Sequence, residues 1–156
     1  MTDATFGSNG WTPDRLGDLT GKSYVITGAN AGAGFQAARI LLEKGAEVVM
    51  LNRSAEKSTA AIAELKTEFG ADAAVRFIRM DLSDLSSVRA AAQDLLASPP
   101  QIDALTCNAA IAQVPTPTLT LDGLHSPLGP ITHLNFFLVR APFYPSAPPQ
   151  ARIRWC

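Results

Sequence analysis

The chain has 156 residues, of which 47% are hydrophobic and 17% are charged, and its formal net charge at pH 7 is −1. This length suits one globular domain with a real core, and a charge near zero gives no reason to expect nucleic acid or an anionic membrane surface as a partner. No apolar run reaches the roughly 18 residues of a membrane-spanning helix, and the polar N-terminus lacks a signal-peptide pattern. The two cysteines, Cys107 and Cys156, have neither metal-binding nor redox spacing. These features predict a cytoplasmic protein.

The order of predicted elements indicates an α/β domain. Residues 1–20 contain repeated turn formers and are predicted to form an N-terminal surface segment. From residue 21 to 121, short apolar strands alternate with amphipathic helices. The strands are predicted at 23–27, 47–51, 75–80 and 102–107, and the helices begin near 34, 54 and 84. Near-continuous apolar strands with short links are typical of a parallel sheet that has helical crossovers and is covered on both faces.

A glycine-rich turn, Thr27-Gly28-Ala29-Asn30-Ala31-Gly32-Ala33-Gly34, joins the first predicted strand to the first helix. Gly28 can adopt a conformation unfavourable for other residues, Gly32 lets the main chain approach a phosphate, and Gly34 lets the helix pack closely on the strand. The free N–H groups and the helix dipole favour an anion here. A plain turn without a ligand is the alternative, but the strand before and the amphipathic helix after favour a dinucleotide site. The predicted contacts are Gly28, Asn30, Ala31, Gly32, Ala33 and Gly34.

The spacing T-G-x-x-x-G-x-G, preceded by Leu19-Thr20-Gly21-Lys22, resembles the short-chain dehydrogenase/reductase family. Within that family it is most similar to the branch of retinol dehydrogenases and protochlorophyllide reductases. The resemblance covers residues 10–124 well and the remaining residues poorly. It implies a Rossmann-like, doubly wound parallel sheet and hydride transfer between a nicotinamide cofactor and an alcohol or carbonyl. The family's catalytic groups are an Asn, a Ser and a Tyr-x-x-x-Lys pair.

The end of the second predicted strand indicates which dinucleotide is bound. An NAD-specific site usually has a carboxylate here, which holds the ribose 2′-hydroxyl. This chain has Asn52 and Arg53 instead. The guanidinium of Arg53 can bind a 2′-phosphate with two hydrogen bonds, so NADP is favoured over NAD. The alternative is a solvated arginine that opens a loop.

Two further positions are assigned from the resemblance. Asp81 and Leu82, after the third predicted strand, match the family's contacts to the adenine, although an aspartate that caps the next helix is the alternative. Asn108-Ala109-Ala110 matches the family's Asn-Ala-Gly, which lies along the cofactor's ribose and steadies the central sheet. Ala110 replaces the glycine, a mild departure that is tolerable where the backbone dihedrals stay negative. Cys107 is interpreted as a buried strand residue rather than a nucleophile.

Residues 122–156 depart from the family pattern. Ten of the eleven prolines lie between Pro99 and Pro149. A proline inside a helix costs about 3 kcal/mol or more, so Pro127, Pro130 and Pro142 exclude the continuous helix that the resemblance predicts here. The family's helix Asn falls on Ile131 or Thr132, no Tyr-x-x-x-Lys occurs, and no lysine follows Lys66. We predict an irregular Pro-rich tail over 122–156, a sheet truncated after about the fourth strand, and no catalytic residue.

These observations leave three hypotheses for function. The first is an oxidoreductase by descent, truncated or frameshifted, whose NADP-binding half-domain at 21–121 has no turnover of its own. The second is a competent reductase that uses unrecognised groups or is completed by a second chain, and the third is a non-enzymatic NADP-binding or scaffold protein. The nicotinamide dinucleotide is the predicted partner in each case. An unpaired sheet edge also predicts self-association.

Overall fold

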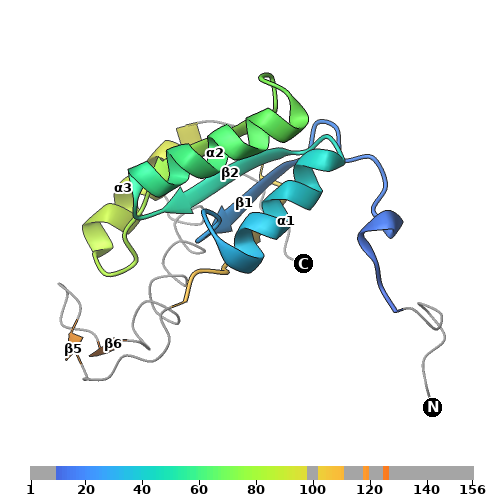
Figure 1. Cartoon of the computed structure of the whole chain (residues 1–156). Coiled ribbons are helices and arrows are strands. Elements are labelled where there is room, and N and C mark those ends of the chain that lie inside the picture. Colours follow the sequence, from blue (N-terminus) through green and yellow to red (C-terminus); the bar gives the residue numbers. More distant parts are fainter. Residues whose placement is uncertain (1–9, 98–101, 111–117, 120–124, 127–156) are drawn as a thin grey trace, which may run out of the picture.

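The computed structural model describes residues 10–97, 102–110, 118–119 and 125–126, in which strands and helices alternate (Figure 1). After a short 3-10 helix, η2 (Pro13–Arg15), the order is β1 (Ser23–Thr27), α1 (Gly32–Glu43), β2 (Glu47–Asn52), α2 (Ala55–Phe69), β3 (Val75–Arg79), α3 (Leu85–Ala97) and β4 (Ala104–Thr106). The predicted alternation is confirmed. Most boundaries agree within one residue, and two differ by more: α1 begins at Gly32 rather than near residue 34, and β4 is shorter than the predicted 102–107 because only three of its residues pair with β1.

All strands of the main sheet are parallel and follow the order β3-β2-β1-β4. The chain builds outward from β1 to β3 and then crosses to the other side of β1 to form β4. The strand order therefore reverses between β1 and β4. In open α/β sheets, ligands bind outside the carboxyl ends of the strands at such a reversal.

Helices α1 and α2 cover one face of the sheet. Strand side chains alternate in direction, so Ile26, Val48 and Met50 point to this face. They form a buried cluster with Phe35, Ala38 and Leu42 of α1 and with Ala61 and Leu65 of α2. Ala29, Ala46 and Val75 are also buried. An exposed ion pair between Arg39 and Glu68 links the two helices.

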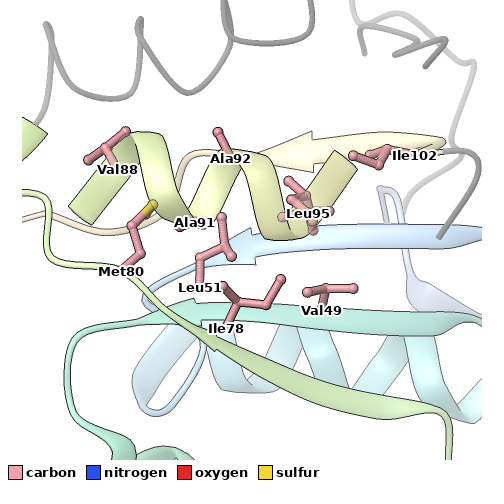
Figure 2. Packing of buried hydrophobic residues seen from close by; sticks show 10 residues of the cluster. Val49, Leu51, Ile78, Met80, Val88, Ala91, Ala92, Leu95 and Ile102 are labelled. Atoms are coloured by element: carbon pink, nitrogen blue, oxygen red, sulfur yellow. The ribbon is translucent and has the colours of Figure 1, made fainter. Parts of the chain in front are cut away.

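Helix α3 covers the opposite face, as Figure 2 shows. The intervening strand residues Val49, Leu51 and Ile78 lie in a second buried cluster. Its other members are Val25, Met80, Val88, Ala91, Ala92, Leu95 and Ile102. Because helices lie on both faces, the sheet is doubly wound, as the resemblance implies. None of the helices in the described part is both long and apolar enough to cross a bilayer.

The start of β4 is held beside β1 by Asp103. One carboxylate oxygen accepts a hydrogen bond from Lys22 Nζ at 3.0 Å, and the other accepts one from the backbone N–H of Ser23 at 3.0 Å. The carboxyl end of β4 consequently lies level with that of β1, where the glycine turn begins.

The structure describes little of the predicted tail. Within 122–156 only His125–Ser126 is described, as β6, which pairs antiparallel with β5 (Thr118–Leu119). This short pairing is a feature that the prediction of an irregular tail did not include. Pro127, Pro130, Pro142, Ile131, Thr132 and Cys156 lie outside the described residues, as do residues 1–9.

Candidate functional site

The glycine turn after β1 is closely packed against the segment after β4. Gly28 has a φ of +70° and donates its N–H to Leu51 O at 2.9 Å. A Cβ at this position would lie 3.0 Å from the Cα of Ala109. Both the left-handed backbone and the lack of space therefore require glycine here.

Gly34 brings α1 against the same turn. A Cβ on Gly34 would lie 2.5 Å from Asn108 Nδ2 and 2.7 Å from Gly28 O, closer than real Cβ contacts. The predicted close packing at this glycine is confirmed. Gly32 is different, because its φ is +58° and a Cβ there would meet nothing within 4 Å. The turn is thus closed toward the protein and open beside Gly32.

The first turn of α1 has no side-chain cap. Ala31 occupies the N-cap position with an extended backbone (φ −161°, ψ 166°), and its side chain makes no capping hydrogen bond. Ala31, Gly32 and Ala33 are exposed. The first N–H groups of a helix have no partner within the helix and carry its positive dipole end. This arrangement can bind an anion such as a phosphate.

The segment after β4 braces the turn. Asn108 Nδ2 donates hydrogen bonds to Thr27 O at 3.0 Å and to Gly28 O at 3.3 Å. The N–H of Ala109 donates to Thr27 Oγ1 at 2.9 Å. These contacts fix the carboxyl ends of β1 and β4 against each other and keep the turn in one conformation.

A cavity of about 180 Å³ lies at the carboxyl ends of the strands. It is smaller than the roughly 300–1,000 Å³ of a typical small-molecule site, so it can hold only part of a dinucleotide. Its lining residues are Gly28, Asn30, Leu51, Asn52, Arg53, Met80, Asp81, Leu82, Ser83, Ala109 and Ala110. The structure thus brings together eight of the thirteen predicted residues here. The other five, Ala31, Gly32, Ala33, Gly34 and Asn108, lie in or directly against the glycine turn.

Sequence reasoning missed Ser83. Its N–H and its hydroxyl both donate to one carboxylate oxygen of Asp81, at 2.8 and 2.6 Å, and none of the described residues donates a hydrogen bond to the other oxygen. A serine two residues after an aspartate is a recognisable local turn signal that could have identified it. The helix-capping alternative for Asp81 is not observed, because Asp84 accepts the hydrogen bonds from the N–H groups of Ser86 and Ser87.

Asn52 and Arg53 differ in what they can offer a ligand. Asn52 is 2% exposed, and its amide hydrogen-bonds to Ala29 N at 2.8 Å and to Ser58 Oγ at 3.0 Å. Arg53 is exposed and makes no ion pair with any described residue. Arg53 is therefore the positive group of this wall that can approach a bound anion.

Two electrostatic observations limit the chemistry of the site. Cys107 lies directly after β4 and is exposed, so the prediction of a buried strand residue is wrong. Desolvation by neighbouring atoms raises the pKa of the Cys107 thiol, which disfavours a reactive thiolate. Within the described part of the chain, no group of His, Cys, Asp and Glu side chains is arranged to hold a metal ion.

Comparison with known proteins agrees with this geometry. A family model described as short chain dehydrogenase matches residues 22–126. A short-chain dehydrogenase/reductase of Armillaria gallica is 39% identical over 128 residues, which cover 81% of this chain and 41% of that protein. Human retinol dehydrogenase 12 is 38% identical over 121 residues, covering 78% and 37%. The structure of an uncharacterized protein from Mycobacterium paratuberculosis superposes with a TM-score of 0.75 at 32% identity, covering 93% of this chain and 48% of that one. The chain spans less than half the length of these relatives.

Proposed function

Because the chain belongs to the short-chain dehydrogenase family, we propose that residues 21–121 form a unit that binds a nicotinamide dinucleotide and prefers NADP to NAD. The observation that carries this proposal is the uncapped start of α1, which follows a turn that lines a cavity together with the exposed Arg53. An anion site and a free cation at one edge of the sheet suit a ligand with phosphates at two places. We further propose a cytoplasmic location, since the cysteine spacing indicates no disulfide framework.

The residues present fit such a cofactor. The N–H groups of Ala31, Gly32 and Ala33 would hold the pyrophosphate, and the open space at Gly32 leaves room for it. Gly28 and Gly34 give the turn its shape, and Asn30 lines the cavity. Arg53 would bind the adenosine 2′-phosphate, with Asn52 fixing the strand end beside it.

The other wall fits the adenosine and the ribose. Asp81 has a carboxylate oxygen that can accept from the adenine amino group, and Leu82 offers an apolar contact and its backbone. Asn108, Ala109 and Ala110 would lie along the second ribose. The bound cofactor supplies the hydride that reactions of this family transfer.

We propose that the 156-residue chain binds the cofactor without turning over a substrate by itself. No Tyr-x-x-x-Lys pair occurs in it, and Tyr24 lies within β1. The family's proton transfer needs a phenol whose pKa is lowered by a lysine. The test is NADPH oxidation by the purified chain with a panel of aldehydes and ketones. We expect none, and any carbonyl-dependent oxidation would overturn this part of the proposal.

The preference for NADP is tested by Arg53→Gln and isothermal titration calorimetry with NADPH and NADH. Loss of a charge-assisted contact to the 2′-phosphate corresponds to roughly 1.5 kcal/mol, so the Kd for NADPH is expected to rise about tenfold. The Kd for NADH should change less than about twofold, because NADH has no 2′-phosphate. The control is Lys66→Gln, which removes a positive charge from the last turn of α2, the helix that follows Arg53. Equal losses for both dinucleotides, or tighter NADH binding by the unmodified chain, would contradict the assignment.

We also propose that this chain associates with itself through the outer edge of β4. In the described sheet β4 is a terminal strand that pairs only with β1. Leu105 is partly exposed and Thr106 is exposed. Open strand edges with apolar neighbours favour addition of another strand. Sedimentation velocity should show a mass that rises with concentration, and a constant monomer mass would reject this proposal.

A further inference from the structure

Two buried polar side chains connect the glycine turn to helix α2. Asn52, the last residue of β2, is 2% exposed, and Ser58 of α2 is fully buried. Asn52 Oδ1 accepts a hydrogen bond from the N–H of Ala29 at 2.8 Å, within the glycine turn. Asn52 Nδ2 donates to Ser58 Oγ at 3.0 Å. One amide thus contacts two elements that are far from each other in the sequence.

The connection continues to the N-cap of the helix. Ser58 Oγ donates to Ser54 O at 2.7 Å, and Ser54 is the N-cap of α2, where its own side chain accepts from Lys57 N at 3.3 Å. A serine that bonds back to the carbonyl four residues earlier is common in helices. Here the same hydroxyl also accepts from Asn52, so its position depends on the strand as well as on the helix.

The two ends of this network are the two segments that bind phosphates under the proposed function. Ala29 lies within the turn that precedes α1, and Ser54 directly follows Arg53. The backbone strengthens the junction, because Gly28 N donates to Leu51 O at 2.9 Å and Met80 N donates to Asn52 O at 2.9 Å. A buried network in which each member satisfies the next keeps one geometry, since any shift leaves a polar group unpaired.

We propose that Asn52 and Ser58 are positioning residues that hold the glycine turn and the start of α2 at a fixed separation, so that α1 and Arg53 contact one dinucleotide at the same time. This inference rests on the proposed function. A ligand that contacts both segments needs the alignment, whereas a ligand without a 2′-phosphate needs only the turn. Neither side chain itself has to contact the cofactor.

The test compares Ser58→Ala with Thr67→Val in the full chain. Thr67 makes the same kind of hydrogen bond, from its hydroxyl to Ala63 O at 2.8 Å, but on the exposed side of α2. Ser58→Ala is expected to raise the Kd for NADPH about tenfold and that for NADH about threefold or less. Thr67→Val should change neither. If the alanine variant does not fold, Ser58→Cys keeps the size of the side chain with a weaker hydrogen-bonding group and should shift both constants in the same direction.

Two further measurements separate positioning from a general loss of structure. In the Arg53→Gln background, Ser58→Ala should cause no additional loss of preference for NADPH. Ser58 affects binding of the 2′-phosphate only by positioning Arg53, which this background lacks. In the ligand-free chain, the hydrogen-exchange rate of the Ala29 amide should rise about tenfold in Ser58→Ala and stay unchanged in Thr67→Val.

The possible failures are distinguishable. If the unmodified chain binds neither dinucleotide, the proposed function is wrong and the positioning role is wrong with it. If the unmodified chain binds NADPH but Ser58→Ala weakens both dinucleotides equally, or leaves Ala29 exchange unchanged, only the positioning role is overturned. Additive effects of the Ser58 and Arg53 substitutions on the preference would also overturn it.

Discussion

Helix α1 begins differently from helices α2 and α3, although all three follow strands of the same sheet. The start of α2 is capped by Ser54, which accepts from Lys57 N, and the start of α3 is capped by Asp84, which accepts from Ser86 N. The start of α1 has the extended N-cap backbone but an alanine in place of a capping side chain. The chain therefore satisfies the first turns of α2 and α3 with its own side chains and leaves that of α1 to water or a ligand.

The same difference appears in the glycines. Gly34 is tightly enclosed by Asn108 and Gly28, while Gly32 faces open space. A turn that served only to connect a strand and a helix would need the close packing at Gly34 but not the open space at Gly32. An uncapped, open and braced helix start is the arrangement that a phosphate completes.

The largest expected effect is from Gly34→Ala. The added methyl would lie 2.5 Å from Asn108 Nδ2 and 2.7 Å from a backbone oxygen, so the turn or α1 must move. We expect a loss of about 3 kcal/mol in the free energy of unfolding, measured by urea denaturation, together with loss of NADPH binding. Gly17→Ala is the control, because a Cβ there meets nothing within 4 Å, and it should stay within about 0.5 kcal/mol of the unmodified chain. Equal urea midpoints for the two variants would show that α1 does not pack as described.

A substitution at Ala31 converts the start of α1 into one that resembles α2 and α3. Ala31→Asp places a capping carboxylate where the backbone already has N-cap geometry, so the unfolding free energy should rise by about 1 kcal/mol. The same carboxylate would repel a phosphate, so the Kd for NADPH should rise at least about tenfold. Ala31→Asn separates the two causes, since it caps the helix without a charge and should weaken binding less. Unchanged NADPH affinity in Ala31→Asp would show that no phosphate of the cofactor binds at the start of α1.

The elements of this fold could be predicted from sequence because their signals are local. Apolar runs mark β1, β2 and β3, and the spacing of Gly28, Gly32 and Gly34 identifies the turn. The partners of Asn52 could not be predicted in this way, because Ala29 and Ser58 reach it only through the register of β1 with β2 and the docking of α2. Sequence assigned Asn52 to the cofactor, whereas its amide bonds within the protein.

The choice between two aspartates shows a second limit of local signals. Asp81 and Asp84 both precede α3, and either could cap it on pattern alone. The position of the helix start decides between them, because only Asp84 lies next to Leu85. Asp81 instead accepts from Ser83 and lines the cavity. The residue at which α3 begins depends on how α3 packs against β3, and a local sequence pattern does not contain that information.

The smallest expected effect concerns the capped start of α3 and its pH dependence. The hydroxyl of Ser86, with the backbone N–H groups of Ser86 and Ser87, favours the ionised carboxylate and lowers the pKa of Asp84. A pKa that is lower in the folded chain gives stability that is present above the unfolded value and is lost as the pH falls through the folded value. The urea midpoint should therefore decline slightly below about pH 4. Asp84→Asn should remove this part of the decline, and Ser86→Ala should raise the pKa of Asp84 in an NMR titration. An Asp84 pKa that does not respond to Ser86→Ala would mean that the hydroxyl does not stabilise the ionised carboxylate. The backbone N–H groups of Ser86 and Ser87 would then be its main stabilising partners.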